Sequence, residues 1–360
     1  MRRLPLAAAM VAFVFFLAWS VAIRQALLFV VGIGFGLVLA GARFGFTTAW
    51  RRLTWNRDPS GVMAQLVLLG VLAAICMPLL AANPTTLGAA LGPPSISLLV
   101  GAFVFGACMQ VADGCGSGTL YKAGMGFELN MAVFPLFAIG SFLGSASLED
   151  WLKLGALKPY GLVNHFGAPV ALAITLAGLV LVGVVAVRWC GGLKAKLWDR
   201  KLLIGAVILA VLAALNLIIA GQPWGIVYGY GLWAAKAAVG LGLFDPAANA
   251  FWSQPVNTTT LAQSVFLDVT SITNIGILAG ALWIGLGKSS SGHRSMTAKQ
   301  WAVVAVAGLL LGYSSRLAFG CNIGAMVSGI STGSLHGWIW VGMAFMGSIL
   351  GLRVRRHFEL

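Results

Sequence analysis

Two glycine-rich stretches of this chain each carry one cysteine in the same spacing. A glycine directly precedes the cysteine and another follows three residues later, which gives Gly114, Cys115 and Gly118 in one stretch and Gly320, Cys321 and Gly324 in the other. A thiol can donate a weak hydrogen bond, and its sulfur can accept one. Glycine allows the backbone to leave a helix and turn sharply. The spacing therefore predicts two backbone breaks, each of which presents a thiol.

A new helix is expected to begin after each predicted break. Gly116 and Thr119 lie at the start of the first such helix, and Asn322 lies at the start of the second. The N-terminus of a helix offers free N–H groups and the positive end of the helix dipole, so it attracts anions without a fixed charge. With a thiol at the same place, the sequence predicts a site for a small anion that itself contains sulfur.

Few other residues near the two cysteines have side chains suited to such a site. Lys122 lies seven positions after the first cysteine and Arg316 five before the second, so each is a weaker candidate for attracting an anion. The alternative is that they extend toward the membrane interface, as long basic side chains do. Cys108 lies about two helical turns before the first cysteine and is also a weak candidate, because packing explains it equally well. Asp113 would repel an anion, so we expect it to pair with a basic group or to cap backbone.

The remaining cysteines give no sign of a metal site or of a disulfide framework. The chain has five cysteines and no Cys-x-x-Cys spacing. Cys76 and Cys190 lie outside any motif and are expected to pack as small apolar side chains. The sequence also lacks the G-x-x-x-x-G-K-[ST] motif of ATP-binding loops. We therefore expect a protein that is not an enzyme and needs neither a metal nor a cofactor.

The rest of the chain is apolar enough to lie in a lipid bilayer. Of its 360 residues, 59% are hydrophobic and only 9% are charged, whereas soluble domains carry about 25% charged residues. The long apolar runs lack the alternation of a membrane β-barrel. We predict an all-α fold, a polytopic membrane helical bundle of about nine spans. Full spans are expected near 5–23, 62–82, 130–147, 168–188, 202–220, 263–286 and 334–352.

Four apolar segments between these spans are interrupted by glycine every few residues and resemble one repeat: 26–50, 96–122, 222–243 and 301–328. In the second and fourth segments a glycine lies nine residues before the cysteine, Cys115 or Cys321. The first segment matches this nine-residue spacing fairly well, and the third segment matches it poorly. Such repeats point to a transporter's binding site built from broken or re-entrant helices. Alternatively, the glycines only allow close packing between helices. This explanation is less favoured for the two segments that carry a cysteine. We expect one transmembrane transporter domain over residues 1–360.

Basic residues are concentrated in short loops and at both ends of the chain. They account for the net charge of +14 and include Arg2, Arg3, Arg51, Arg52, Arg57, Arg188, Lys194, Lys196, Arg200, Lys201, Lys288, Arg294, Lys299, Arg353, Arg355 and Arg356. This distribution follows the positive-inside rule, so it predicts a multi-pass protein of the inner (plasma) membrane with both termini in the cytoplasm. The alternative is a polybasic patch for lipid or RNA. We expect the bilayer as partner and no nucleic acid.

The two cysteine stretches, GACMQVADGCGSGTLYKAGMG and RLAFGCNIGAMVSGISTGSLHGW, resemble the YeeE/YedE family of sulfur-compound transport proteins. Weaker matches, ARFGFTTAWR, QPWGI, LWAAK and DVTSITNIGILAGA, extend the resemblance from about residue 32 to 352. The resemblance implies about nine spans, with repeated loops that dip in from both faces. It also implies uptake of thiosulfate, passed between central thiols that correspond to Cys115 and Cys321.

The chain departs from the family pattern at one position. Gly45 stands where the resemblance implies a further cysteine, so a relay of three thiols would not operate unchanged, although Cys108 is a candidate replacement. A selenium compound or another sulfur species therefore stays open as substrate. A membrane-embedded sulfurtransferase with a persulfide on one cysteine is an alternative from another class, and a helper subunit is a third. Because the membrane potential opposes anion uptake, we expect proton coupling or cytoplasmic trapping, with a sulfur-carrier protein as a candidate partner.

Overall fold

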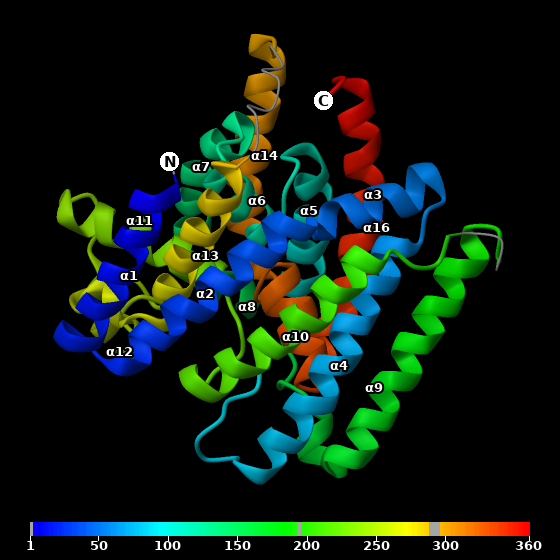
Figure 1. Ribbon diagram of the computed structural model, residues 1–360, viewed down its shortest axis with the longest axis horizontal. Coiled ribbons are helices and arrows are strands. Elements are labelled where there is room, and N and C mark those ends of the chain that lie inside the picture. The colour runs from blue at the N-terminus through cyan, green and yellow to red at the C-terminus, as the bar shows by residue number, and fades with distance from the viewer. Residues whose placement is uncertain (1–2, 193–195, 288–295) are drawn as a thin grey trace.

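The regular elements of the chain are helices, as the computed structural model shows for residues 3–192, 196–287 and 296–360 (Figure 1). In this described part, nine helical segments are long and apolar enough to cross a membrane: Arg3–Ser20, Ile23–Asn56, Ser60–Ala82, Ile96–Gly124, Glu128–Ala146, Leu162–Trp189, Arg200–Ala220, Ala298–Ser331 and Leu335–His357. The predicted all-α, multi-pass membrane bundle is confirmed. Arg2, Lys194, Lys288 and Arg294, which contribute to the basic clusters, lie outside the described residues.

Three of these segments consist of a helix, a break and a second helix. The pairs are α2 (Ile23–Ala42) with α3 (Phe46–Asn56), α5 (Ile96–Val111) with α6 (Gly116–Gly124), and α14 (Ala298–Leu317) with the π-helix η4 (Asn322–Ser328) and α15 (Gly329–Ser331). They coincide with three of the four glycine-interrupted segments that the sequence singles out. The remaining segment, the third in chain order at 222–243, follows α10 (Arg200–Ala220). It contains an irregular turn and the short helix α11 (Val227–Gly240).

The other helices frame these broken segments. They are α1 (Arg3–Ser20), α4 (Ser60–Ala82), α7 (Glu128–Ala146), α8 (Leu148–Lys153), α9 (Leu162–Trp189), α12 (Pro255–Ala262), α13 (Val269–Gly285) and α16 (Leu335–His357), with short 3₁₀ turns at Pro246–Ala248 and Val265–Leu267. The span predicted at 263–286 is shorter than expected. Asp268 accepts the backbone N–H of Ser271 and so starts α13 late, which leaves 17 residues, fewer than the roughly 20 that a full crossing needs.

The glycine that lies nine residues before each break is a packing residue. Helix α2 packs against α13, α5 against α16, and α14 against α7. A Cβ on the glycine would collide with a backbone carbonyl oxygen of the partner helix: Ile277 for Gly36, Ala344 for Gly106 and Phe137 for Gly312. Close packing through small residues therefore accounts for these three glycines, whereas the glycines beside the cysteines belong to the breaks.

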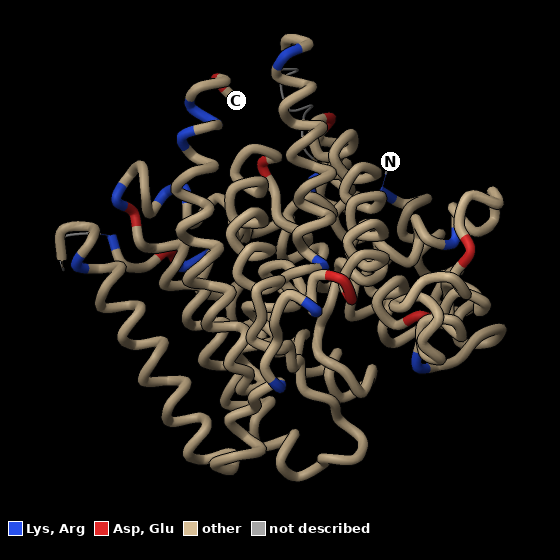
Figure 2. The backbone as a smooth tube through the Cα atoms, turned by 180° about the vertical axis from the view of Figure 1, so that it is seen from behind, with Lys and Arg blue, Asp and Glu red and all other residues tan. Residues whose placement is uncertain are grey.

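The two cysteine breaks are approached from opposite ends of the molecule. Helix α14 begins at the end that holds both termini, whereas α5 begins at the other end, after the cyan loop of residues 83–95 (Figure 1). Most Lys and Arg residues of the described chain gather toward the end with the termini (Figure 2). The broken helices therefore meet inside the bundle with opposite directions, and the two ends of the molecule differ in charge.

Candidate functional site

Cys115 and Cys321 close the two breaks in nearly identical backbone conformations. Their φ and ψ angles are −87° and −168° for the first and −89° and −167° for the second, and each residue directly precedes a helix. Two positions earlier, Asp113 and Phe319 both adopt left-handed conformations, with φ of 52° and 57°. That region costs about 1–2 kcal/mol for an L-residue. The same strained turn therefore presents both thiols.

The two cysteines, far apart in sequence, are brought together at Gly116. A Cβ built on Gly116 would lie 2.7 Å from the Cys321 sulfur, closer than a real side-chain carbon approaches. Both thiols are fully buried. The absence of a side chain at position 116 thus lets the second sulfur reach the start of the helix that the first cysteine caps.

Backbone amides at the start of each helix surround the sulfur atoms. The Cys115 sulfur accepts the Gly118 N–H at 3.4 Å and lies 3.4 Å from the Ser117 hydroxyl. The amides of Ile323 and Gly324 lie near the Cys321 sulfur without meeting hydrogen-bond geometry. Both thiols therefore sit at the positive ends of helices, in the arrangement that the glycine spacing predicts.

Two aromatic side chains donate hydrogen bonds to backbone carbonyl groups beside the two cysteines. The Tyr230 hydroxyl donates to the Gly116 carbonyl oxygen at 2.9 Å, and the Trp340 indole donates to the Gly320 carbonyl oxygen at 3.2 Å. A backbone group outside the helical ladder costs several kcal/mol in a membrane unless it has a partner. Sequence reasoning missed both residues, because nothing in their spacing links them to a cysteine motif.

The third glycine-interrupted segment reaches the same centre. The carbonyl oxygen of Trp224 accepts a hydrogen bond from Ser328 at 2.6 Å, and that of Ile226 accepts one from Asn274 at 2.9 Å. Val227 lies beside Gly116, where its methyl group is 3.2 Å from the position of a Cβ. This segment lines the centre although its glycine spacing fits the repeat poorly.

Several buried polar atoms at the breaks have no partner within the described residues. They are Thr119 Oγ1, Asn130 Nδ2, Trp224 Nε1 and both side-chain polar atoms of Asn322. Thr119 and Asn130 flank Gly114, at 2.8 and 3.2 Å from the position of a Cβ there. An unsatisfied buried polar group costs about 1–3 kcal/mol, and native proteins contain few. Most of these atoms can donate, so acceptor oxygens of a ligand would satisfy them.

Asp113 is held by three cations next to the first break. Its carboxylate lies 2.5 Å from Arg51, 2.7 Å from Lys122 and 3.7 Å from Arg355. The Lys122 amine also donates to the Asp113 carbonyl oxygen at 2.5 Å. The prediction that Asp113 pairs with a basic group is confirmed. Lys122 thus fixes the turn before Cys115, and this structural contact occupies the amine that the sequence suggested for an anion.

Replacing Asp113 by asparagine is expected to lower the free energy of unfolding by about 2 kcal/mol, because it leaves three partly buried cations without their carboxylate. The midpoint of thermal unfolding of the purified protein measures this effect. Asp150→Asn is the matched control, since Asp150 pairs with Lys153 through side chains that are 75% exposed and exposed pairs contribute little. Equal midpoints for the two variants would contradict a stabilising role of the cluster.

Arg316 carries a charge that no acidic side chain of the described chain neutralises through an ion pair. Its Nε donates to the Ser145 hydroxyl at 2.8 Å, and its guanidinium carbon lies 5.5 Å from the ring centres of both Tyr228 and Phe251. Aromatic faces stabilise a cation without cancelling its charge. Arg316 is therefore held in place and still able to attract an anion.

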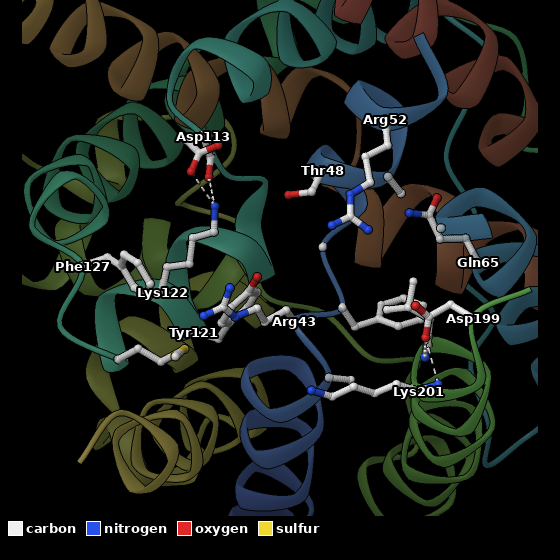
Figure 3. Close-up of a pocket in the computed structure, with 17 residues that line it drawn as sticks. Arg43, Thr48, Arg52, Gln65, Asp113, Tyr121, Lys122, Phe127, Asp199 and Lys201 are labelled. Atoms are coloured by element: carbon white, nitrogen blue, oxygen red, sulfur yellow. Dashed lines mark hydrogen bonds and ion pairs between the residues drawn. The ribbon is translucent and has the colours of Figure 1, made fainter. Parts of the chain in front are cut away.

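Cys108 and Gly45, the other two positions linked to a relay of thiols, lie in different surroundings. Cys108 packs in the main apolar core on α5, as the packing alternative expects. Gly45 lines a separate cavity of about 370 Å³, where a Cβ would lie 3.7 Å from the Tyr121 hydroxyl (Figure 3). The position at which the resemblance implies a third thiol thus opens into this cavity.

Comparison with known proteins shows the family to which the chain belongs. The sequence pattern of the family described as "Sulphur transport" matches residues 41–350. A thiosulfate transporter, TsuA, from Spirochaeta thermophila is 25% identical over 337 residues, which cover 86% of this chain and 92% of that protein. Thiosulfate transporter TsuA from Escherichia coli is 23% identical over 333 residues, which cover 88% of this chain and 89% of that protein. The chain therefore belongs to the sulphur transport family, as its resemblance to YeeE/YedE proteins predicted.

Proposed function

We propose that the protein imports a small sulfur oxyanion, most directly thiosulfate, along a pathway that narrows at Cys115 and Cys321. The observation that carries the proposal is the close approach of the Cys321 sulfur to Gly116, which follows Cys115 directly, so that two buried thiols lie at the starts of two opposed helices. The thiosulfate transporters among its relatives support this substrate. We treat the whole chain as one transport unit.

The narrow point suits an anion that must pass rather than stay. Its donors are thiols, helix N-terminal amides and the unpartnered groups of Thr119 and Asn322. Conduction requires binding that is favourable enough to admit an ion and weak enough to release it. Neutral donors meet that condition better than a fixed cation, which would hold a divalent anion tightly.

Arg316 would attract the anion on its way to the thiols. The positive-inside rule places the end with the termini in the cytoplasm of a plasma (inner) membrane, so the anion would approach from the opposite face. Moving one negative charge inward against 100 mV costs about 2.3 kcal/mol, and a divalent anion about twice that. Import would therefore need proton coupling or consumption of the ion inside, for example by a sulfur-carrier protein.

Uptake of ³⁵S-labelled thiosulfate into proteoliposomes of the purified protein tests the proposal. We expect saturable uptake above that of empty liposomes, with stronger competition from unlabelled thiosulfate than from sulfate. Competition by a selenium compound or another sulfur species that exceeds competition by thiosulfate would change the substrate. Uptake equal to that of empty liposomes under an imposed proton gradient and in its absence would refute import.

The sulfurtransferase alternative requires a thiolate that can reach both a donor and an acceptor. Cys115 and Cys321 are both fully buried, which favours passage of the ion over covalent transfer. Intact-mass measurement after incubation with thiosulfate separates the two functions. Transport leaves the mass unchanged, whereas a persulfide would appear as one added sulfur that reductant removes.

A further inference from the structure

A cavity lined by basic residues lies toward the end of the molecule that holds the termini. It has a volume of about 370 Å³ and is walled by the α2–α3 junction, by α6 and by the start of α10 (Figure 3). We call it the basic vestibule. Its charged lining residues are the cations Arg43, Arg52, Lys122 and Lys201 and the acids Asp113 and Asp199.

Four cations outnumber two acids in this lining, and three of the four cations have no ion-pair partner among the described residues. Asp113 pairs with Lys122 at 2.7 Å, and Asp199 accepts backbone N–H groups at the start of α10. Within the described residues, Arg43, Arg52 and Lys201 have no ion-pair partner. In Figure 3 the Arg52 side chain reaches from α3 toward the middle of the view, and the Lys201 side chain extends from α10 along its lower edge. The vestibule therefore holds an uncompensated positive charge.

Tyr121 connects the vestibule to the thiols. It lies on α6, the helix that Cys115 caps, and it also lines the vestibule. Its hydroxyl faces Gly45, which adds no side chain to the gap between them. The volume of about 370 Å³ equals roughly a dozen water molecules. A small oxyanion with part of its water shell fits this space.

We propose that the basic vestibule is a second binding site for a divalent sulfur oxyanion, with Arg43, Arg52 and Lys201 as its ligands. The identity of the anion rests on the proposed function, whereas the site itself rests on the charges and the cavity. Guanidinium groups bind oxyanions through pairs of parallel N–H···O bonds. Because these side chains remain in contact with water, binding is moderate and allows release. The vestibule thus draws the anion away from the thiols toward the end with the termini.

Equilibrium dialysis with ³⁵S-labelled thiosulfate tests the vestibule in the purified full-length chain. The background is Cys115→Ala/Cys321→Ala, so that the central thiols contribute nothing. We expect saturable binding in this background and at least about a ten-fold weaker affinity after Arg43→Gln/Arg52→Gln/Lys201→Gln, because charge-assisted hydrogen bonds are the strongest polar contacts. Sulfate should compete with the label, and chloride at equal ionic strength should not.

The matched control is Arg188→Gln/Arg353→Gln/Arg356→Gln, which removes the same charge from residues outside the vestibule lining. We expect its affinity to stay within about two-fold of the background. The proposal is overturned if the background shows no saturable binding, if the control loses as much affinity as the vestibule variant, or if chloride competes as well as sulfate. Arg52→Gln alone replaces the triple variant if the latter is not monodisperse on size exclusion.

This result is separable from the outcome for import. Thiosulfate binding in the vestibule together with no uptake by the unmodified protein would refute the proposed function and leave the vestibule site intact. Uptake that depends on the thiols, together with no charge-dependent binding in the vestibule, would refute only the inference about the vestibule.

Discussion

Replacement of either Cys115 or Cys321 by alanine is expected to lower thiosulfate uptake by about 100-fold while the protein remains folded. Each substitution removes an S–H donor from the narrowest part of the proposed pathway, and a hydrogen bond to a charged group is worth about 1.5–3 kcal/mol. Both sulfurs are fully buried, and the methyl group of alanine supplies no donor in their place. Initial rates of ³⁵S-thiosulfate uptake into proteoliposomes measure the effect.

Two other cysteines provide the controls for these variants. Cys76 packs in the core on α4, and Cys190 follows the end of α9. Cys76→Ala and Cys190→Ala remove the same atoms from positions outside the proposed pathway, so we expect nearly normal uptake. Size exclusion and the thermal midpoint show whether each variant is folded. Full uptake by all four variants would contradict any role of the thiols in transport.

The breaks were predictable from sequence because their causes are local. Glycines flanking Cys115 and Cys321 permit the turn, and the same short segment supplies the helix start. The nine-residue glycine spacing is equally visible in sequence, but its meaning is not. Positions 106 and 312 require glycine because carbonyl groups of other helices lie against them. These partner groups lie far away in the sequence, so the glycine spacing does not reveal them.

The parts of the site that sequence could not predict depend on contacts between distant segments. Tyr230 and Trp340 could not be predicted from local motifs. Their hydrogen-bond partners, the carbonyl groups of Gly116 and Gly320, lie 114 and 20 residues away in the sequence. Lys122 was predicted as a candidate for attracting the anion. The structure instead pairs it with Asp113, in a cluster completed by Arg51 and Arg355 from two other helices. Charge alone does not tell which cations are already neutralised.

Gly116→Ala is expected to lower uptake at least about ten-fold with little change in stability. The added methyl group would lie 2.7 Å from the Cys321 sulfur and 3.2 Å from its Cβ, so the thiol must move away from the junction. Overpacking of this kind costs about 1–3 kcal/mol. Gly116 is the first residue of α6, where alanine in place of glycine returns only part of the roughly 1 kcal/mol of a helix interior. The two effects partly cancel in the free energy of unfolding. Nothing offsets the effect of the displaced thiol on the rate of uptake.

Gly342→Ala is the control for this substitution, because no atom lies within 4 Å of a Cβ at that position in α16. We expect it to keep full uptake and to match Gly116→Ala in expression and monodispersity. Normal uptake by Gly116→Ala would show that the approach of the Cys321 sulfur to the start of α6 is not needed for passage of the ion. Loss of uptake in Gly116→Ala with both thiols still present would instead assign the function to their arrangement, since the substitution changes neither charge nor the number of sulfur atoms.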